Sequence, residues 1–157
     1  MRASLRIGLA AAAAAVAALL AASHAAARQA CTAGTHSSGG VTYRTFCGPA
    51  HATLKVGGQT LTFKGGSCQI NSSIFSINIG TITLPPGKPK YDYFGITVFA
   101  KKGGTYKNQS VTWQLPHGKH GSLISATIKL ASNRKSGSFS GTVLGASGKG
   151  NGTFSCS

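Results

Sequence analysis

Apolar and polar side chains alternate along much of the chain, and the clearest example is the segment ATLKVGGQTLTFK, Ala52–Lys64. Its two halves flank Gly57-Gly58, a dipeptide that favours a two-residue hairpin turn. Extended on both sides of that turn, the segment places its apolar residues on one face, namely Leu54, Val56, Leu61 and Phe63. The opposite face carries Thr53, Lys55, Thr60, Thr62 and Lys64. We therefore predict a β-hairpin with one buried and one exposed face.

The same alternation recurs roughly every ten residues, as expected for short strands separated by turns. The apolar positions of three further predicted strands are Phe75, Ile77 and Ile79; Phe94, Ile96 and Val98; and Ile124, Ala126, Ile128 and Leu130. No segment after the leader shows helical periodicity, and the 22 glycines supply turns. The pattern predicts an all-β fold, built either as two packed antiparallel sheets or as a partly closed barrel.

Two further segments complete this expectation. Leu84–Lys90, LPPGKPK, cannot join a central strand because proline lacks an amide hydrogen, so we predict a loop that crosses between strands. The final segment Gly137–Ser157 contains two alternating runs around a turn and predicts a terminal hairpin. Its inward-facing residues are expected to be Phe139, Val143, Phe154 and Cys156.

The first 27 residues have the pattern of a secretory signal peptide. Arg2 and Arg6 form a short basic leader, Ile7–Ala22 is almost wholly apolar, and Ala25–Ala27 provide a small-residue cleavage site. No later run is apolar enough to span a bilayer, so we expect no transmembrane segment. We predict one exported β domain over residues 28–157, secreted or held in the cell envelope.

Four cysteines follow the leader: Cys31, Cys47, Cys68 and Cys156. In an exported domain of this size they indicate two disulfides, for which three pairings exist. We favour Cys31 with Cys47, which closes a short N-terminal loop, and Cys68 with Cys156, which ties the last strand to the middle of the fold.

Charge is the most unusual feature of the composition. Of 16 Lys and Arg residues, 14 remain after Arg2 and Arg6 are removed with the leader, against one acid, Asp92, which gives 14 − 1 = +13. Such a field attracts polyanions. Nine of these cations lie between Lys88 and Lys135, a distribution that fits an anion-binding face and equally fits a plain solvated surface. The candidate anion-binding residues are Lys88, Lys90, Lys101, Lys102, Lys107 and Lys119.

The residue inventory argues against catalysis. Glycosidase, calcium-loop and two-metal mechanisms need several carboxylates, and the domain has Asp92 alone. His117 and His120 have a spacing that could present two imidazoles to a metal, but a lysine lies between them and the segment has the composition of a turn. We predict no enzyme activity, no catalytic residue, no bound metal and no cofactor.

Three classes of function remain. The first is an envelope or secreted binding protein whose basic face holds anionic wall polymers, lipid headgroups or host glycans. The second is a carrier of an apolar or acyl ligand, with a cavity lined by Phe75, Phe94, Phe99 and Trp113. The third is a nucleic-acid binder that uses Trp113, Tyr91, Tyr93 and Tyr106 for stacking beside a basic groove. We favour the first, with a monomeric protein that binds nucleic acid only non-specifically.

Short motifs between Leu54 and Ser157 resemble those of one known family. They are Val56 with Gly58-Gln59, the central Cys68, Ile77–Gly80 in the form INIG, Gly141-Thr142 and the final Cys156-Ser157. Together they resemble the mycobacterial lipoprotein-antigen family, small secreted β proteins typified by the nineteen-kilodalton antigen. The resemblance also implies the Cys68–Cys156 bond. Family members are lipidated on the first mature cysteine, whereas Cys31 follows Arg28-Gln29-Ala30, so here we expect a disulfide at Cys31 in place of a lipid.

Overall fold

Ten β-strands and no helix form in residues 31–157, which are the residues that the computed structural model describes. The predicted signal peptide lies outside the described residues. The strands are β1 (Gly34–Ser38), β2 (Val41–Phe46), β3 (Ala50–Val56), β4 (Gln59–Ile70), β5 (Phe75–Thr83), β6 (Tyr93–Val98), β7 (Gly104–Gln114), β8 (His120–Leu130), β9 (Ser136–Val143) and β10 (Lys149–Ser155). The prediction of an all-β fold is confirmed.

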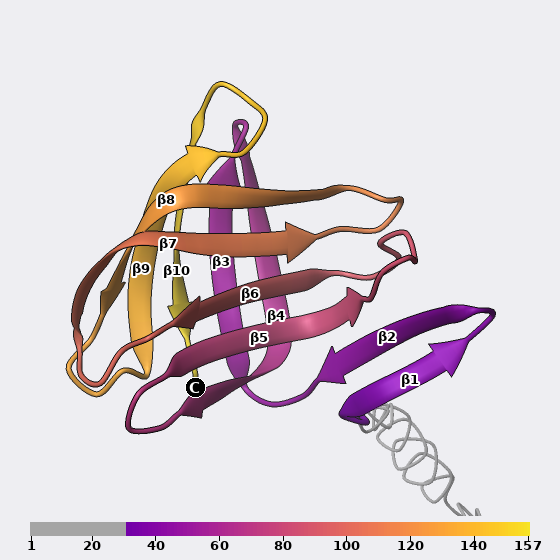
Figure 1. Ribbon diagram of the computed structural model, residues 1–157, viewed down its shortest axis with the longest axis horizontal. Helices are drawn as coiled ribbons and strands as arrows, with labels where there is room; N and C mark the ends of the chain where they lie inside the picture. The colour runs from indigo at the N-terminus through magenta and orange to yellow at the C-terminus, as the bar shows by residue number, and fades with distance from the viewer. Residues whose placement is uncertain (1–30) are drawn as a thin grey trace, which may run out of the picture. The chain divides into compact units, whose positions relative to one another are not determined.

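Eight of these strands close into a barrel (Figure 1). Antiparallel hydrogen bonding runs in the order β5-β4-β3-β10-β9-β8-β7-β6, and β6 pairs again with β5 to complete the circle. The barrel is therefore fully closed, one step beyond the partly closed barrel of the sequence prediction. Two separate packed sheets are not seen in the described residues, because one continuous sheet connects all ten strands.

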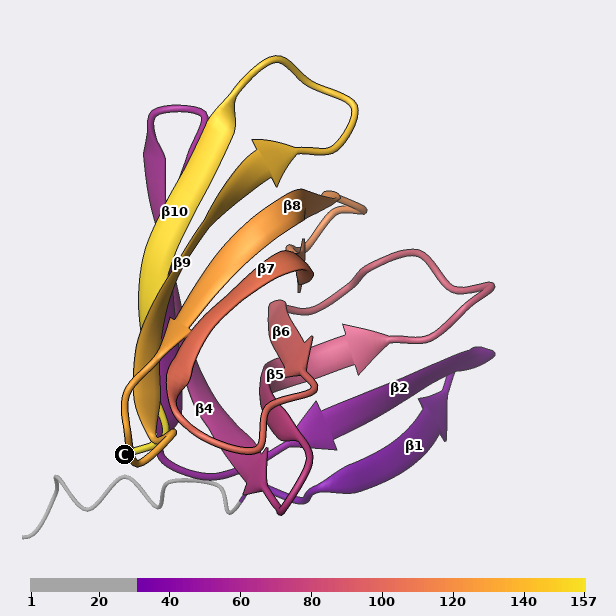
Figure 2. The same ribbon diagram turned by 60° about the vertical axis from the view of Figure 1, so that its left-hand side comes forward.

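The remaining strands, β1 and β2, form a hairpin that extends the sheet beyond the barrel (Figure 2). Along one edge of β5, β4 pairs with Phe75–Ile79, and β2 takes over the same edge at Gly80–Thr83. The first disulfide, Cys31–Cys47, joins the two ends of this hairpin with a Cα–Cα distance of 5.8 Å. It confirms the predicted pairing, and the thiol of Cys31 is therefore not free.

The predicted Gly57-Gly58 hairpin is confirmed by β3 and β4. Leu54 lies opposite Leu61 and Ala52 opposite Phe63 in the register of the pair. Gly57 and Gly58 have φ angles of 56° and 75°, the left-handed values that a two-residue type I′ turn requires at both central positions. The alternation in the sequence therefore gives both the register and the buried face of this hairpin.

A chain of phenylalanine rings fills the interior of the barrel. Ring centroids are 5.3 Å apart for Phe63 and Phe94, 5.4 Å for Phe94 and Phe139, and 5.3 Å for Phe75 and Phe154. Phe139 and Phe154, 6.5 Å apart, join these pairs into one chain whose ends are Phe63 and Phe75. Phe139 and Phe154 are buried, with Val143 and Cys156 packed against the same core, so the predicted inward face of the terminal hairpin is confirmed.

Two predictions about the strands are wrong. Ile124 is exposed, and Leu123 is buried in its place, because β8 shifts register between Ile124 and Thr127 and Ser125 adopts a left-handed φ of 49°. Leu84–Lys90 is a loop, as expected, but it crosses nothing. It joins β5 and β6, which are direct neighbours in the barrel.

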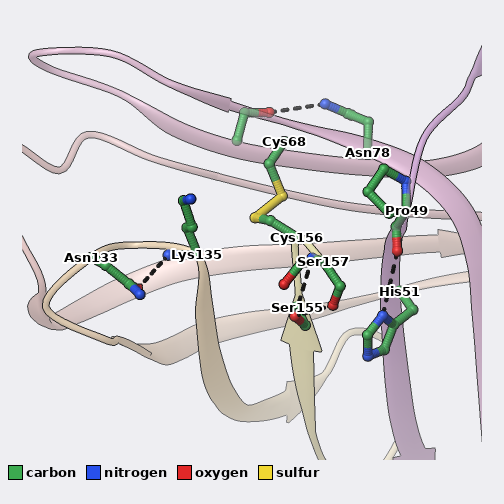
Figure 3. The surroundings of a disulfide bond; sticks show 10 residues. Pro49, His51, Cys68, Asn78, Asn133, Lys135, Ser155, Cys156 and Ser157 are labelled. Atoms are coloured by element: carbon green, nitrogen blue, oxygen red, sulfur yellow. Dashed lines mark hydrogen bonds between the residues drawn. A yellow bond between two sulfur atoms is a disulfide. The ribbon is translucent and has the colours of Figure 1, made fainter.

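The barrel has two ends with different connections, because consecutive strands from β3 to β10 are antiparallel neighbours and their loops alternate between the ends. The mouth end carries the Gly57-Gly58 turn and the loops 84–92, 115–119 and 144–148. The disulfide end carries the connections 71–74, 99–103 and 131–135 and the bond Cys68–Cys156. This second bond confirms the other predicted pairing and joins β4 to the residue after β10 (Figure 3).

Arg134 holds the loops of the disulfide end together. Its Nη1 atom donates hydrogen bonds of 2.7 Å to the carbonyl oxygens of both Asn71 and Ala100, which belong to two other connections. Arg134 itself has a left-handed φ of 57°, an unfavourable conformation for a non-glycine residue that surrounding contacts must stabilise. One side chain therefore links three connections at this end of the barrel.

We expect Arg134→Ala to lower the free energy of unfolding by about 1 to 3 kcal/mol, since two charge-assisted hydrogen bonds are lost and the backbone strain remains. Lys135→Ala is the matched control, because Lys135 is exposed in the same turn and its substitution is expected to cost less than about 0.5 kcal/mol. Urea denaturation of the two variants measures the difference. Equal losses would show that Arg134 does not link these loops.

Candidate functional site: two basic ends of the barrel

All eleven lysines after residue 30 are exposed, and the acid that could pair with them is Asp92 alone. Asp92 lines a groove with Lys64, Thr62 and Ile79, among other residues. The positive field of the described residues is therefore almost unopposed, and its strength depends on salt.

The structure divides the six candidate lysines between different regions. Lys88, Lys90 and Lys119 lie on the loops of the mouth end. Lys101 and Lys102 lie at the disulfide end, in the connection between β6 and β7, and Lys107 lies within β7 beside a register shift. Proximity in the sequence suggested one face, but the alternation of loops between the two ends separates the first three lysines from Lys101 and Lys102.

An open groove of about 500 Å³ lies among the loops of the mouth end. It is lined by Lys88, Pro89, Lys90, Tyr91, Pro116, His117 and Gly118, and we call this set the basic mouth. Lys119 follows in the same turn as His117 and Gly118. The groove thus combines ammonium groups, an imidazole and one aromatic side chain, and it contains no carboxylate among its lining residues.

Hydrogen bonds from the strands hold the loops of the basic mouth in place. The amide of Gly118 donates to the carbonyl oxygen of Pro89 at 3.0 Å, which joins the two loops directly. The side chain of Gln114 bonds both backbone groups of Thr83, accepting from its amide at 3.0 Å and donating to its carbonyl at 3.3 Å. The hydroxyl of buried Thr83 accepts from the amide of Lys90 at 3.1 Å. The lysines of the groove therefore extend from a fixed backbone.

A row of rings continues from the basic mouth onto β1 and β2. Tyr91 lies 5.3 Å from Tyr43, and Tyr43 stacks on His36 at 5.4 Å, measured between ring centroids. Tyr91 is 39% exposed, so part of its side chain is available to a ligand. Aromatic surfaces beside cations suit ligands that have both flat apolar faces and negative charge, such as the rings of acidic sugars.

Sequence reasoning missed a second basic groove on the outside of the barrel. Lys55 and Lys129 line it together with hydroxyl and amide side chains of β3, β8, β9 and β10, which are Thr53, Thr127, Ser138, Ser140, Asn151 and Thr153. The cross-strand register could have indicated it, because Lys55 lies opposite Asn151 and Lys129 opposite Ser138. It contains no exposed aromatic side chain.

The aromatic residues predicted for nucleic-acid stacking are not gathered on one surface. Trp113 and Tyr93 are buried, whereas Tyr106 donates its hydroxyl to the carbonyl oxygen of Lys102 at the opposite end from Tyr91. Burial raises the pKa of Tyr93, with smaller opposing effects from a hydrogen bond to Thr112 and from the charge of Arg44. The Tyr93 hydroxyl therefore remains a neutral donor, which bonds Asn78 at 2.7 Å.

The carrier hypothesis required a cavity lined by four aromatic side chains. Phe75 and Phe94 are fully buried within the packed core, Trp113 is 7% exposed, and Phe99 is 80% exposed on the outside. Every fully buried side-chain nitrogen or oxygen in residues 31–157 has a hydrogen-bond partner, so no such polar atom points unpaired into the interior. These aromatic residues do not line a common space.

Within residues 31–157, no group of three or more His, Cys, Asp or Glu residues is placed to hold a metal ion. His117 lies in the basic mouth, and Nδ1 of His120 lies 3.1 Å from the carbonyl oxygen of Gly118. In the same part of the chain, no helix has the length and apolar character needed to cross a membrane.

Comparison of the chain with protein-family models, with curated proteins and with solved structures finds no match. The two disulfides indicate an oxidising compartment outside the cytoplasm, because such bonds rarely persist where thiols are kept reduced.

Proposed function

We propose that this protein is a non-enzymatic binding protein of an exported compartment, secreted or held in the cell envelope, which associates with anionic envelope polymers, lipids or host glycans. One observation carries the proposal: Lys88, Lys90 and His117 converge with Tyr91 around a groove that no acid lines. We also propose that the predicted signal peptide is cleaved and that the protein is related to the lipoprotein-antigen family.

Binding at the basic mouth is electrostatic and shallow. Lysines act as point charges, and no arginine lines the groove to bind a carboxylate or phosphate in bidentate fashion. Charges within a screening length of about 8 Å at physiological salt reinforce one another, so two lysines on one groove act together. Affinity is therefore expected to fall steeply as salt rises.

We expect Lys88→Gln/Lys90→Gln to weaken binding of polygalacturonate, an anionic polysaccharide, by about five- to tenfold at low salt, because each exposed charge contact contributes up to about 1 kcal/mol. The control is Lys55→Gln/Lys129→Gln, which removes the same net charge from the outer groove and is expected to weaken binding about twofold or less. Isothermal titration over a salt series measures both. Equal losses would assign binding to the overall field, and absence of binding at low salt would overturn the proposed function.

A further inference from the structure

Phe99 is the most exposed of the large apolar side chains in the described residues, at 80%. It directly follows β6, and its neighbours Val98 and Ala100 are both fully buried. The backbone at Phe99 is therefore held by the residues on either side, which are anchored in the barrel core. Most other large apolar side chains of the described residues are buried.

Lysines lie on the connection that contains Phe99 and on the connection hydrogen-bonded to it at the disulfide end. Lys101 and Lys102 follow it in the same connection, and Lys135 lies in the turn 131–135. The hydrogen bond from Arg134 to the carbonyl oxygen of Ala100 joins these two connections, and Lys135 follows Arg134 directly. Asp92, the single acid, belongs to the loop 84–92 at the opposite end of the barrel.

An apolar ring among lysines matches one kind of partner surface. At a bilayer interface, an aromatic ring enters the boundary between headgroups and acyl chains while lysines remain among anionic headgroups. A soluble polyanion would satisfy the lysines and leave the ring in water. The combination therefore favours a lipid surface over a soluble polymer at this end.

We propose that the tip formed by Phe99, Lys101, Lys102 and Lys135 docks on a bilayer surface that contains anionic lipids, with the ring of Phe99 inserted at the interface. This site lies at the opposite end of the barrel from the basic mouth. It rests on the proposed function and assigns the lipid association to the disulfide end, which leaves the basic mouth to soluble anionic polymers. Each lysine near an anionic surface increases partitioning about fivefold, and the buried ring adds about another tenfold.

Phe99→Trp provides a direct test, because Phe99 is exposed and the native Trp113 is buried and supplies a constant background. With vesicles of phosphatidylglycerol in phosphatidylcholine, its emission is expected to shift to the blue and to be quenched by lipids brominated in the acyl chains. Leu144→Trp is the matched control, since Leu144 is 60% exposed but lies at the mouth end, and its emission is expected to stay unchanged.

Phe99→Ser should also reduce co-sedimentation with these vesicles by about tenfold, while Leu144→Ser leaves it unchanged. Unshifted Phe99→Trp emission on vesicles that bind the protein, or an equal shift at position 144, would overturn the proposal. Binding of polygalacturonate by Phe99→Ser should remain as in the natural protein. This last measurement separates the two proposals, because failure of the lipid site leaves polysaccharide binding intact.

Discussion

Replacing Cys68 and Cys156 together by alanine is expected to lower the free energy of unfolding by about 4 to 5 kcal/mol. The two cysteines are 88 residues apart, so their bond restricts a long loop of the unfolded chain. Domains of this size have a total stability of about 5 to 15 kcal/mol, so the variant is expected to be close to unfolding at 37 °C.

The position of this disulfide in the barrel supports a large effect. β4 and β10 are not direct neighbours, since β3 lies between them, so the bond spans the sheet at the disulfide end. Cys156 also donates its amide to the carbonyl oxygen of Lys135 at 2.8 Å, which holds the end of β10 beside the turn 131–135. Loss of the bond removes a link between strands that the hydrogen-bond ladder does not join directly.

The matched control for this variant is Cys31→Ala/Cys47→Ala. Its sequence separation is 16, for which the loop-entropy estimate is about 3 kcal/mol, and its hairpin lies outside the closed barrel. Urea denaturation under oxidising conditions compares the two. An equal or greater loss for the Cys31/Cys47 variant would contradict the account of Cys68–Cys156.

Phe139→Ala is expected to cost about 3 to 5 kcal/mol, because the vacated volume lies in the middle of the chain of core rings. Phe139 is 3% exposed and contacts Phe94 and Phe154. Its ring also lies over Gly152, where an added Cβ atom would meet the ring at 2.6 Å. No small adjustment of these rings fills the space that one phenyl group leaves.

Phe99→Ala is the control, since this exposed phenylalanine lies outside the core and its loss is expected to cost less than about 0.5 kcal/mol. Thermal or urea unfolding measures both variants. A loss below about 1 kcal/mol for Phe139→Ala would show that the interior is loosely packed, and the carrier hypothesis would then regain support.

The sequence predicts the strands of this fold well because each strand has one buried face. Leu54 and Phe63, like Phe75 and Ile77, alternate with polar residues, and this alternation alone gives the buried face. The cysteine pairing was also predictable, since one pair closes a local loop and the other joins the end of the chain to its middle.

Barrel closure was not predictable from the same pattern. An alternating strand looks alike in an open sheet and in a barrel, and closure depends on the pairing of β5 with both β4 and β6. The register shift at Ser125 was not predictable for a related reason. Ile124 fits the apolar alternation of the sequence, and nothing in that pattern indicates that Ser125 has a left-handed φ angle.

The sequence predicted that the site would be basic, but it did not predict which residues would lie together there. Lys88 and Lys90 were identified from local density of charge, but His117 and Tyr91 join them only because the loops 84–92 and 115–119 meet at one end of the barrel. Lys101 and Lys102 were assigned to the same face and lie at the other end. Which lysines lie at the same end of the barrel depends on the order of the strands, and the positions of the lysines in the sequence do not give that order.

The measurement that tests the central claim most directly is a nitrogen-15 spectrum of the protein titrated with short polygalacturonate oligomers. If the basic mouth binds anionic polymers, the largest shift changes should fall on the amides of residues 88, 90, 91 and 117–119. Changes concentrated around Lys55 and Lys129, or small uniform changes across the barrel, would contradict the account and assign binding to the outer groove or to the overall field.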